Sequence, residues 1–264
     1  VLIPVVPGNN CEVDSARAVE RAGSDIEFCI VLNGDQAELA ESVDEMVRRI
    51  NEAQIVMIPG GFSAGDEPDG SGKFIAALFR NRKLEEAMEA LLHRRDGLVL
   101  GICNGFQALI KLGLVPYGEF KPLTGDAPTL TFNTIGRHLS RYVTTKVVSV
   151  KSPWLALTKP GDLHSIAISH GEGRFIASPE QIRAWAANGQ IATQYTDELG
   201  HASYDSTFNP NESVWAVEGI TSPDGRVLGK MGHSERRGDN IAKNISGEKY
   251  QPPFAAGVRY FTGK

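Results

Sequence analysis

A cysteine between two glycines is the residue whose setting most clearly predicts chemistry. Cys103 lies in Gly101-Ile-Cys-Asn-Gly105, between an apolar run typical of a strand and a stretch typical of a helix. A nucleophile on a tight strand-to-helix turn needs small neighbours. The first amides of the helix favour a thiolate and can also bind an oxyanion. We therefore interpret Cys103 as a nucleophile, and Cys11 and Cys29 as buried structural cysteines.

A nucleophilic cysteine needs a base, and His233 is the best placed of the six histidines. It follows an apolar run, Arg226 to Met231, and is two residues before Glu235. Residues two apart in an extended segment project to the same side, so the carboxylate can fix the imidazole tautomer. His170 is the only serious competitor. The remaining histidines considered lie in settings without such a partner and are predicted to be non-catalytic: His93, His138 and His201.

A third segment, Pro59-Gly-Gly-Phe-Ser63, also follows an apolar run directly. Backbone amides at the carboxyl edge of a sheet, not covered by side chains, suit an oxyanion hole. By itself the segment is more typical of an ordinary tight turn. Together with the other two motifs, it is interpreted as a candidate oxyanion hole.

Alternating strand and helix patterns position these motifs. We expect strands at 1–6, 26–32, 55–58 and 98–100, and helices at 12–22, 42–50, 73–93 and 106–112. From about Thr129 the pattern becomes β-rich, at 129–135, 142–150, 165–169, 190–195, 214–220 and 227–231. The alternation predicts an α/β fold with a mostly parallel central sheet flanked by helices, extended by mixed strands. We expect one domain over 1–264, with 236–264 forming an irregular C-terminal extension.

Composition excludes several classes of protein. The formal net charge of −5 lacks the basic excess of nucleic-acid binders, and no apolar run reaches the roughly 18 residues of a membrane span. Three cysteines are too few for a disulfide scaffold, which favours a reduced, cytoplasmic setting. The start within an apparent strand and the generous length favour one domain of a longer fused chain over a free subunit.

The order of motifs resembles the class I (triad) glutamine amidotransferases. Within that family four segments are similar to the glutaminase part of phosphoribosylformylglycinamidine synthase, the purine-pathway ligase. They are Gly60-Gly-Phe-Ser-Ala-Gly-Asp66, Gly101-Ile-Cys-Asn-Gly-Phe-Gln107, Ser169-His-Gly-Glu-Gly173 and Asn209-Pro-Asn211. The opening Pro7-Gly-Asn-Asn-Cys-Glu12 also resembles that family, and the similarity extends to about Arg236.

The resemblance implies a class I amidotransferase-like fold and a role for each motif. Cys103 would attack the carboxamide of L-glutamine, His233 would move the proton, and Glu235 would orient His233. The amides of Gly61 or Phe62 and of Asn104 would stabilise the oxyanion. Glutamine would be held by Gln107, Ser169, His170 and Gly171. The ammonia would serve a synthase domain or subunit of the same enzyme, which would also carry ATP and magnesium.

Two positions depart from the family pattern. Ser234 stands where the family often has proline, which removes rigidity, and Glu212 stands where glycine is common, which puts the conformation of that loop in doubt. The resemblance implies no cofactor or metal on this chain. The glycines of Gly65 to Lys73 do not have P-loop spacing, and Phe74 stands where a P-loop has serine or threonine.

Three alternatives stay open. A cysteine-type α/β-hydrolase would place its acid before its histidine in the chain, unlike Glu235. An amidotransferase of another biosynthetic ligase would share the triad but not the segments around 60–66 and 169–173. A non-enzymatic binding module could keep the fold without the chemistry.

Overall fold

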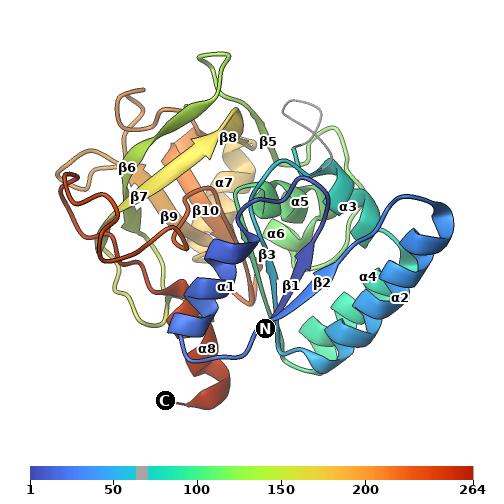
Figure 1. Cartoon of the computed structure of the whole chain (residues 1–264). Helices are drawn as coiled ribbons and strands as arrows, with labels where there is room; N and C mark the ends of the chain where they lie inside the picture. Colours follow the sequence, from blue (N-terminus) through green and yellow to red (C-terminus); the bar gives the residue numbers. More distant parts are fainter. Residues whose placement is uncertain (64–70, 264) are drawn as a thin grey trace.

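A nine-stranded sheet forms the centre of the molecule. The structure is a computed structural model that describes residues 1–63 and 71–263 (Figure 1). The strand order is β2-β1-β3-β4-β11-β10-β9-β6-β7. The first five strands of that order are parallel and the rest pair antiparallel. The predicted α/β fold, mostly parallel at its centre with additional mixed strands, is confirmed.

The strands are short, and several are buried along their whole length. Their bounds are β1 (Leu2–Val5), β2 (Glu27–Ile30), β3 (Ile55–Ile58), β4 (Leu98–Ile102), β6 (Leu139–Val147), β7 (Leu163–His170), β9 (Ile191–Thr196), β10 (Val217–Thr221) and β11 (Val227–Lys230). A separate antiparallel pair is formed by β5 (Thr129–Phe132) and β8 (Glu172–Ile176).

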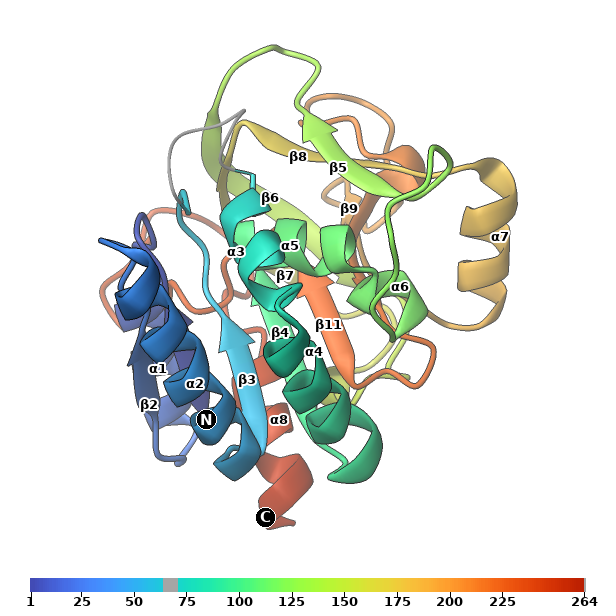
Figure 2. The ribbon, with the colours of Figure 1, turned by 90° about the vertical axis from the view of Figure 1, so that its right-hand side faces the viewer.

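Helices cover both faces of the parallel strands. Their bounds are α1 (Glu12–Arg21), α2 (Gln36–Glu52), α3 (Lys73–Phe79), α4 (Arg82–Glu89), α5 (Asn104–Leu112), α6 (Leu114–Tyr117), α7 (Pro179–Ala187) and α8 (Pro253–Thr262), with a π-helical turn (Ala90–Arg94) and two 3-10 turns (Pro153–Leu155 and Val214–Ala216). Helix α1 packs against α8 on one face, whereas α2 packs against α4 and α3 against α5 on the other (Figures 1 and 2). In the described residues no helix combines the length and the apolarity needed to cross a membrane.

Two predicted elements differ from the structure, and two observed elements were not predicted. The helix expected over 73–93 is interrupted after Phe79, because Asn81 has an extended backbone and its side chain accepts from the Lys83 amide as the cap of α4. The segment 236–264 is not irregular throughout, since it contains α8. Strand β8 and helix α7 were not predicted, although α7 begins with a capping box in which Ser178 and Gln181 satisfy each other's backbone amides.

The carboxyl ends of three neighbouring strands bring the motifs together. β3, β4 and β11 are adjacent and parallel, so their ends meet at one edge of the sheet (Figure 2). Gly60 follows β3, Cys103 follows β4 directly, and His233 comes three residues after β11. Segments more than a hundred residues apart in the chain therefore meet at one place, as ligand sites in open α/β sheets do.

Candidate active site

Cys103 occupies a strained turn between β4 and α5. Its φ is +51°, a left-handed value that costs a non-glycine residue of order 1–3 kcal/mol and is characteristic of functional turns. The flanking glycines are required by packing. A Cβ on Gly101 would lie 2.5 Å from Leu109 Cδ1, and one on Gly105 would collide with the carbonyl oxygen of Ile58. Cys103 as a whole is 5% exposed, so the residue is buried.

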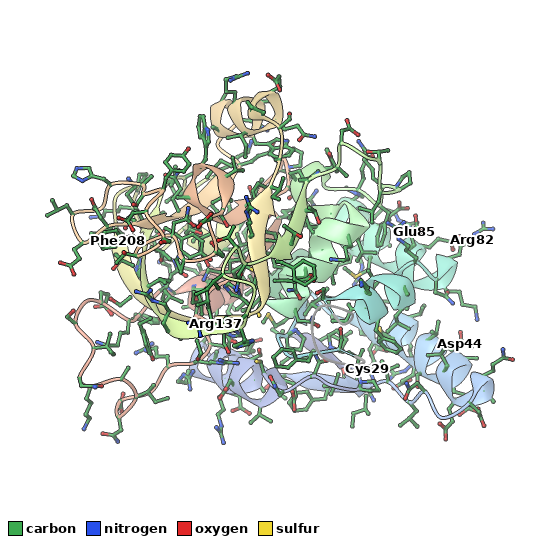
Figure 3. All side chains as sticks on the ribbon, turned by 90° about the horizontal axis from the view of Figure 1, so that it is seen from above. Cys29, Asp44, Arg82, Glu85, Arg137 and Phe208 are labelled. Atoms are coloured by element: carbon green, nitrogen blue, oxygen red, sulfur yellow. The ribbon has the colours of Figure 1, made fainter. Side chains whose placement is uncertain are left out.

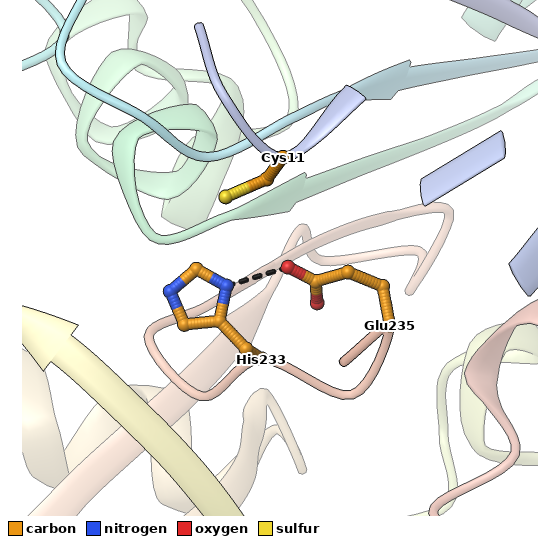
Figure 4. A group of neighbouring side chains, drawn as sticks. All are labelled: Cys11, His233 and Glu235. Carbon is orange, nitrogen blue, oxygen red and sulfur yellow. Dashed lines mark hydrogen bonds and ion pairs between the residues drawn. The ribbon is translucent and has the colours of Figure 1, made fainter. Parts of the chain in front are cut away.

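His233 and Glu235 form a buried pair. His233 Nδ1 and Glu235 Oε1 are 2.5 Å apart, and both residues are nearly inaccessible to water (Figure 4). Burial would raise the pKa of Glu235, but the charge and hydrogen bond of His233 offset this and hold it below its usual value. An ionised Glu235 can only accept from Nδ1, so Nε2 is the ring nitrogen left for proton transfer. The amide of His233 donates to the carbonyl of Ala167 at 2.8 Å and fixes the loop on β7.

Gly60 shows how closely the cysteine and the histidine approach. A Cβ built on Gly60 would lie 3.0 Å from His233 Cε1, 3.2 Å from Cys11 Sγ and 3.4 Å from Cys103 Cβ. The absence of a side chain at this position therefore lets the imidazole and the two cysteines gather around one point. The structure brings together the residues that the sequence predicted as nucleophile, base and orienting carboxylate.

A buried polar network holds the loop that carries His233. Lys230 Nζ donates to the carbonyl of Gly232 at 2.7 Å and to Ser234 Oγ at 3.0 Å, and lies 3.2 Å from Glu218 Oε1. Ser234 in turn donates to Gln251 Oε1 at 2.7 Å, immediately before α8. The hydroxyl of Ser234 thus fixes the loop by hydrogen bonds at the position where the family often uses proline. The rigidity that the serine was expected to remove is supplied by Lys230 and Gln251.

The glycine loop after β3 packs against the opening loop of the chain. The Phe62 amide donates to the carbonyl of Gly8 at 2.9 Å, so it is not available to an oxyanion in this conformation. Gly61 has a φ of +132°, and a Cβ there would lie 2.8 Å from the Asn10 amide nitrogen. The amides of the other two predicted oxyanion donors, Gly61 and Asn104, do not take part in this hydrogen bond to Gly8. Residues 64–66 of the predicted motif lie outside the described residues.

Two residues predicted to hold glutamine already have protein partners. Gln107 Nε2 donates to the carbonyl of Glu172 at 2.6 Å, and its Oε1 accepts from Asn104 Nδ2 at 3.0 Å. Gln107 therefore ties α5 to the start of β8. His170 is completely buried and its Nδ1 lies 3.2 Å from Asn133 Oδ1. Burial, followed by repulsion from His233 and His138, lowers the pKa of His170 to about 3, so it is neutral at pH 7.

Ser169, which was predicted to hold glutamine, lies near Cys103 and also contacts His138, which was not predicted to belong to the site. The carbonyl of Ser169 is 3.6 Å from Cys103 Sγ, and its hydroxyl is 3.0 Å from the exposed His138 Nε2. The His138 ring also lies beside Phe62, with centroids 6.0 Å apart. The carbonyl of Gly171 accepts a hydrogen bond from the backbone amide of Asn133 at 2.8 Å. No sequence pattern links His138 to the site, because its position depends on how β6 pairs with β7.

The Asn209-Pro-Asn211 motif is hydrogen-bonded to β8 and β9. Asn211 Nδ2 donates to the carbonyl of Gly173 at 2.7 Å and to the Tyr195 hydroxyl at 3.1 Å. Glu212 has a φ of +55°, the left-handed conformation that glycine adopts most easily. The loop therefore keeps a conformation suited to glycine although this chain has glutamate there.

Cys11 lies beside His233 and Glu235, which the sequence did not predict. Ligand atoms of Cys11, His233 and Glu235 are all within 4.8 Å of one another (Figure 4). Thiol, imidazole and carboxylate suit a zinc ion. Against a cation, Arg236 donates to Cys11 Sγ at 3.0 Å, and the His233 nitrogen facing Glu235 is already hydrogen-bonded.

Cys29, by contrast, lies on β2, one edge strand of the sheet. Figure 3 shows it well apart from Arg137, the neighbour of His138. It is buried, and burial is also the main cause that raises the pKa of its thiol. Its surroundings agree with the structural role predicted for it.

Comparison with known proteins shows the family to which the chain belongs. A family model described as a CobB/CobQ-like glutamine amidotransferase domain matches residues 1–262. A phosphoribosylformylglycinamidine synthase subunit PurQ from Pyrococcus horikoshii is 34% identical over 246 residues, covering 93% of this chain and 92% of that protein. The subunit of the same name from Symbiobacterium thermophilum is 32% identical, covering 99% and 97%. The solved structure of PurLQS from Thermotoga maritima superposes with a TM-score of 0.68 at 25% identity, covering 98% and 97%.

Proposed function

This chain belongs to the CobB/CobQ-like glutamine amidotransferase family, and we propose that it is the glutaminase of a phosphoribosylformylglycinamidine synthase. It hydrolyses L-glutamine to glutamate and ammonia. The synthase uses that ammonia to convert formylglycinamide ribonucleotide to formylglycinamidine ribonucleotide in purine biosynthesis. The observation that carries the proposal is the approach of Cys103 and His233 around Gly60, with Glu235 hydrogen-bonded to His233, in a chain whose relatives bear this enzyme's name.

The chemistry divides into two steps. His233 Nε2 accepts the Cys103 proton, and the sulfur attacks the side-chain amide carbon of glutamine, giving a tetrahedral oxyanion. His233 returns the proton to the leaving nitrogen, so that the C–N bond breaks and ammonia departs, leaving a thioester. Water then attacks the thioester as His233 removes its proton, and glutamate leaves while the thiol reforms. Glu235 stabilises the imidazolium in both steps.

The oxyanion is stabilised by two backbone amides. We assign these to Gly61 and Asn104, because the Phe62 amide already donates to Gly8. Each such donor contributes about 2.7–4 kcal/mol to transition-state stabilisation in a comparable site. Glutamine lies against Ser169 and Gly171, where Ser169 is close to the nucleophile. Gln107 and His170 support the structure around this region, because their side chains are already hydrogen-bonded to Glu172 and Asn133.

The partner of this chain is the synthase subunit or domain that holds the acceptor. ATP and magnesium act there, and we assign neither cofactor nor metal to the glutaminase. We place the enzyme in the cytoplasm, where free thiols such as Cys103 stay reduced. Nucleic acid and membrane are not partners in this proposal.

A labelling experiment tests the proposal. The full chain is combined with its synthase partner, ATP, magnesium and formylglycinamide ribonucleotide, and glutamine labelled with ¹⁵N at the side-chain amide is supplied. The label should appear in formylglycinamidine ribonucleotide, detected by mass spectrometry. Release of labelled ammonia without transfer to this acceptor, together with transfer to the acceptor of another biosynthetic ligase, would identify a different amidotransferase. Absence of any released label would contradict glutaminase activity.

A further inference from the structure

A line of three side chains runs past the triad. Arg236 Nη2 donates to Cys11 Sγ at 3.0 Å, and the Cys11 thiol donates to Asn10 Oδ1 at 3.1 Å. Cys11 therefore has a donor on one side and an acceptor on the other, which fits a neutral thiol. Burial, with further repulsion from Glu235, raises the pKa of Cys11 to about 11, although Arg236 acts in the opposite direction.

Arg236 brings a positive charge into a buried, negatively charged group. Burial would lower the pKa of Arg236, but the nearby Cys11, Glu235 and Cys103 raise it above its usual value, so the guanidinium stays charged. Lys230, the buried last residue of β11, lies 3.2 Å from the carboxylate of Glu218 and pairs with it. Arg236 is therefore a cation placed to balance Glu235, and its charge helps to lower the pKa of that carboxyl.

The positive charge of Arg236 offsets the negative charge of Glu235. Glu235 alone gives the site a net charge of −1, which opposes formation of a second anion on Cys103. With Arg236 the group is neutral, both before and after the thiol proton moves to His233. A nearby opposite charge lowers the pKa of an acid by about 1–3 units in such settings.

We propose that Arg236 is a positioning residue of the glutaminase site: it holds the Cys11 thiol beside His233, within 4.8 Å of a ring nitrogen, and favours the thiolate of Cys103. The role rests on the proposed glutaminase function, since it acts on the nucleophile and base assigned there. The contact works through Cys11, which shares the space around Gly60 with His233 and Cys103. Arg236 itself does not contact the reacting atoms.

Other titratable groups also face Cys103 and would shape its pH profile. Tyr195 on β9 interacts electrostatically with Cys103, and His233 and Cys11 share the space around Gly60 with it. Glu235 acts through its hydrogen bond to His233, and His170 on β7 interacts with His233. Arg21, on α1, donates to the carbonyl of Glu235 at 3.3 Å. These groups are unchanged in the comparison that follows, so they do not account for a difference between its variants.

Neighbouring arginines provide a matched test. Arg236→Gln removes the charge beside Cys11, whereas Arg237→Gln removes a charge one residue further along, from a guanidinium stacked 3.7 Å from the Tyr250 ring centroid. Arg236→Lys keeps the charge. The rate of Cys103 alkylation by iodoacetamide, a neutral reagent, is measured from pH 5 to 10 on the full chain, with the modified cysteine identified by mass spectrometry.

The expected result is an apparent pKa of Cys103 raised by about one unit in Arg236→Gln, equivalent to about 10-fold slower alkylation below the pKa. Arg237→Gln should match the parent, and Arg236→Lys should recover most of the shift. Equal profiles for Arg236→Gln and Arg237→Gln would overturn the proposal. Should Arg236→Gln not fold, a parental profile in a folded Arg236→Lys supports the charge role, and a profile shifted by a unit overturns it. Alkylation needs no glutamine, so failure here is distinct from failure of the proposed function, which is measured as ammonia release.

Discussion

Adding one methyl group at Gly60 should impair catalysis while leaving the fold intact. The Cβ of Gly60→Ala would lie 3.0 Å from His233 Cε1 and 3.4 Å from Cys103 Cβ. Ordinary carbon–carbon contacts are about 3.5–4.0 Å, so the imidazole must move by about 0.5 Å. A misplacement of about 1 Å can cost about 10²-fold in rate, and half of that displacement predicts a loss of about 10-fold in kcat. Overpacking should cost about 1–3 kcal/mol of stability.

Two other glycines give matched controls. Gly125→Ala adds a methyl group with no atom within 4 Å and should change neither activity nor stability. Gly61→Ala should be worse than Gly60→Ala, because its φ of +132° is strained for alanine and its Cβ would meet backbone of the opening loop at 2.8 Å. Backbone cannot move aside as readily as a side chain.

The assay compares glutamine-dependent with ammonium-dependent synthesis by the complete synthase, together with chemical unfolding of each variant. Gly60→Ala should lower only the glutamine-dependent rate, since free ammonium bypasses the site. A parental glutamine-dependent rate in Gly60→Ala would refute the geometry inferred here for Cys103 and His233. A parallel fall in both rates would instead indicate damage to the assembly.

Three further predictions concern the residues around the nucleophile. His233→Ala should lower glutamine turnover by about 10²–10⁴-fold and Glu235→Gln by less, whereas a larger loss in His170→Ala than in His233→Ala would show that the base is misassigned. The pKa of His170 is about 3 in the folded protein and near 6.5 in the unfolded chain, so the stability contributed by the neutral ring is full above pH 6.5 and falls toward pH 3. His170→Gln should therefore make the fall of unfolding free energy with decreasing pH shallower, by up to about 1.4 kcal/mol per pH unit. An unchanged slope would contradict a buried neutral ring. Glu212→Gly should relieve about 1–2 kcal/mol of left-handed strain and cost about 0.5–1 kcal/mol of added chain entropy, for a net gain of about 0–1.5 kcal/mol in the free energy of urea unfolding. A clear loss would mean that the glutamate side chain stabilises the loop.

The parallel half of the fold was predictable because its signals are local. Ile55–Ile58 and Leu98–Ile102 are continuous apolar runs, which is the pattern of strands buried on both faces. Each run ends in a glycine motif whose backbone demands are visible in the sequence. The order of these strands in the sheet then places the motifs at one edge without further information.

The features that were missed depend on contacts between distant segments. Helix α8 has few helix-forming residues, and its Gly257 is explained only by close packing on the Trp154 ring, where a Cβ would collide. In the sequence Cys11 is indistinguishable from an ordinary buried cysteine. Its place near His233 appears only when the opening loop folds beside the loop after β11. The partners of Gln107 likewise appear only when α5 and β8 come together.

The central claim is that Cys103 is the nucleophile of a glutaminase, and one substitution tests it most directly. Cys103→Ala is assembled with the synthase partner, and formylglycinamidine ribonucleotide formation is measured with glutamine and then with ammonium as the nitrogen source, beside Cys29→Ala as the control. Glutamine-dependent synthesis should be abolished and ammonium-dependent synthesis retained in Cys103→Ala, with both retained in Cys29→Ala. Glutamine-dependent synthesis at a near-parental rate in Cys103→Ala would contradict the account.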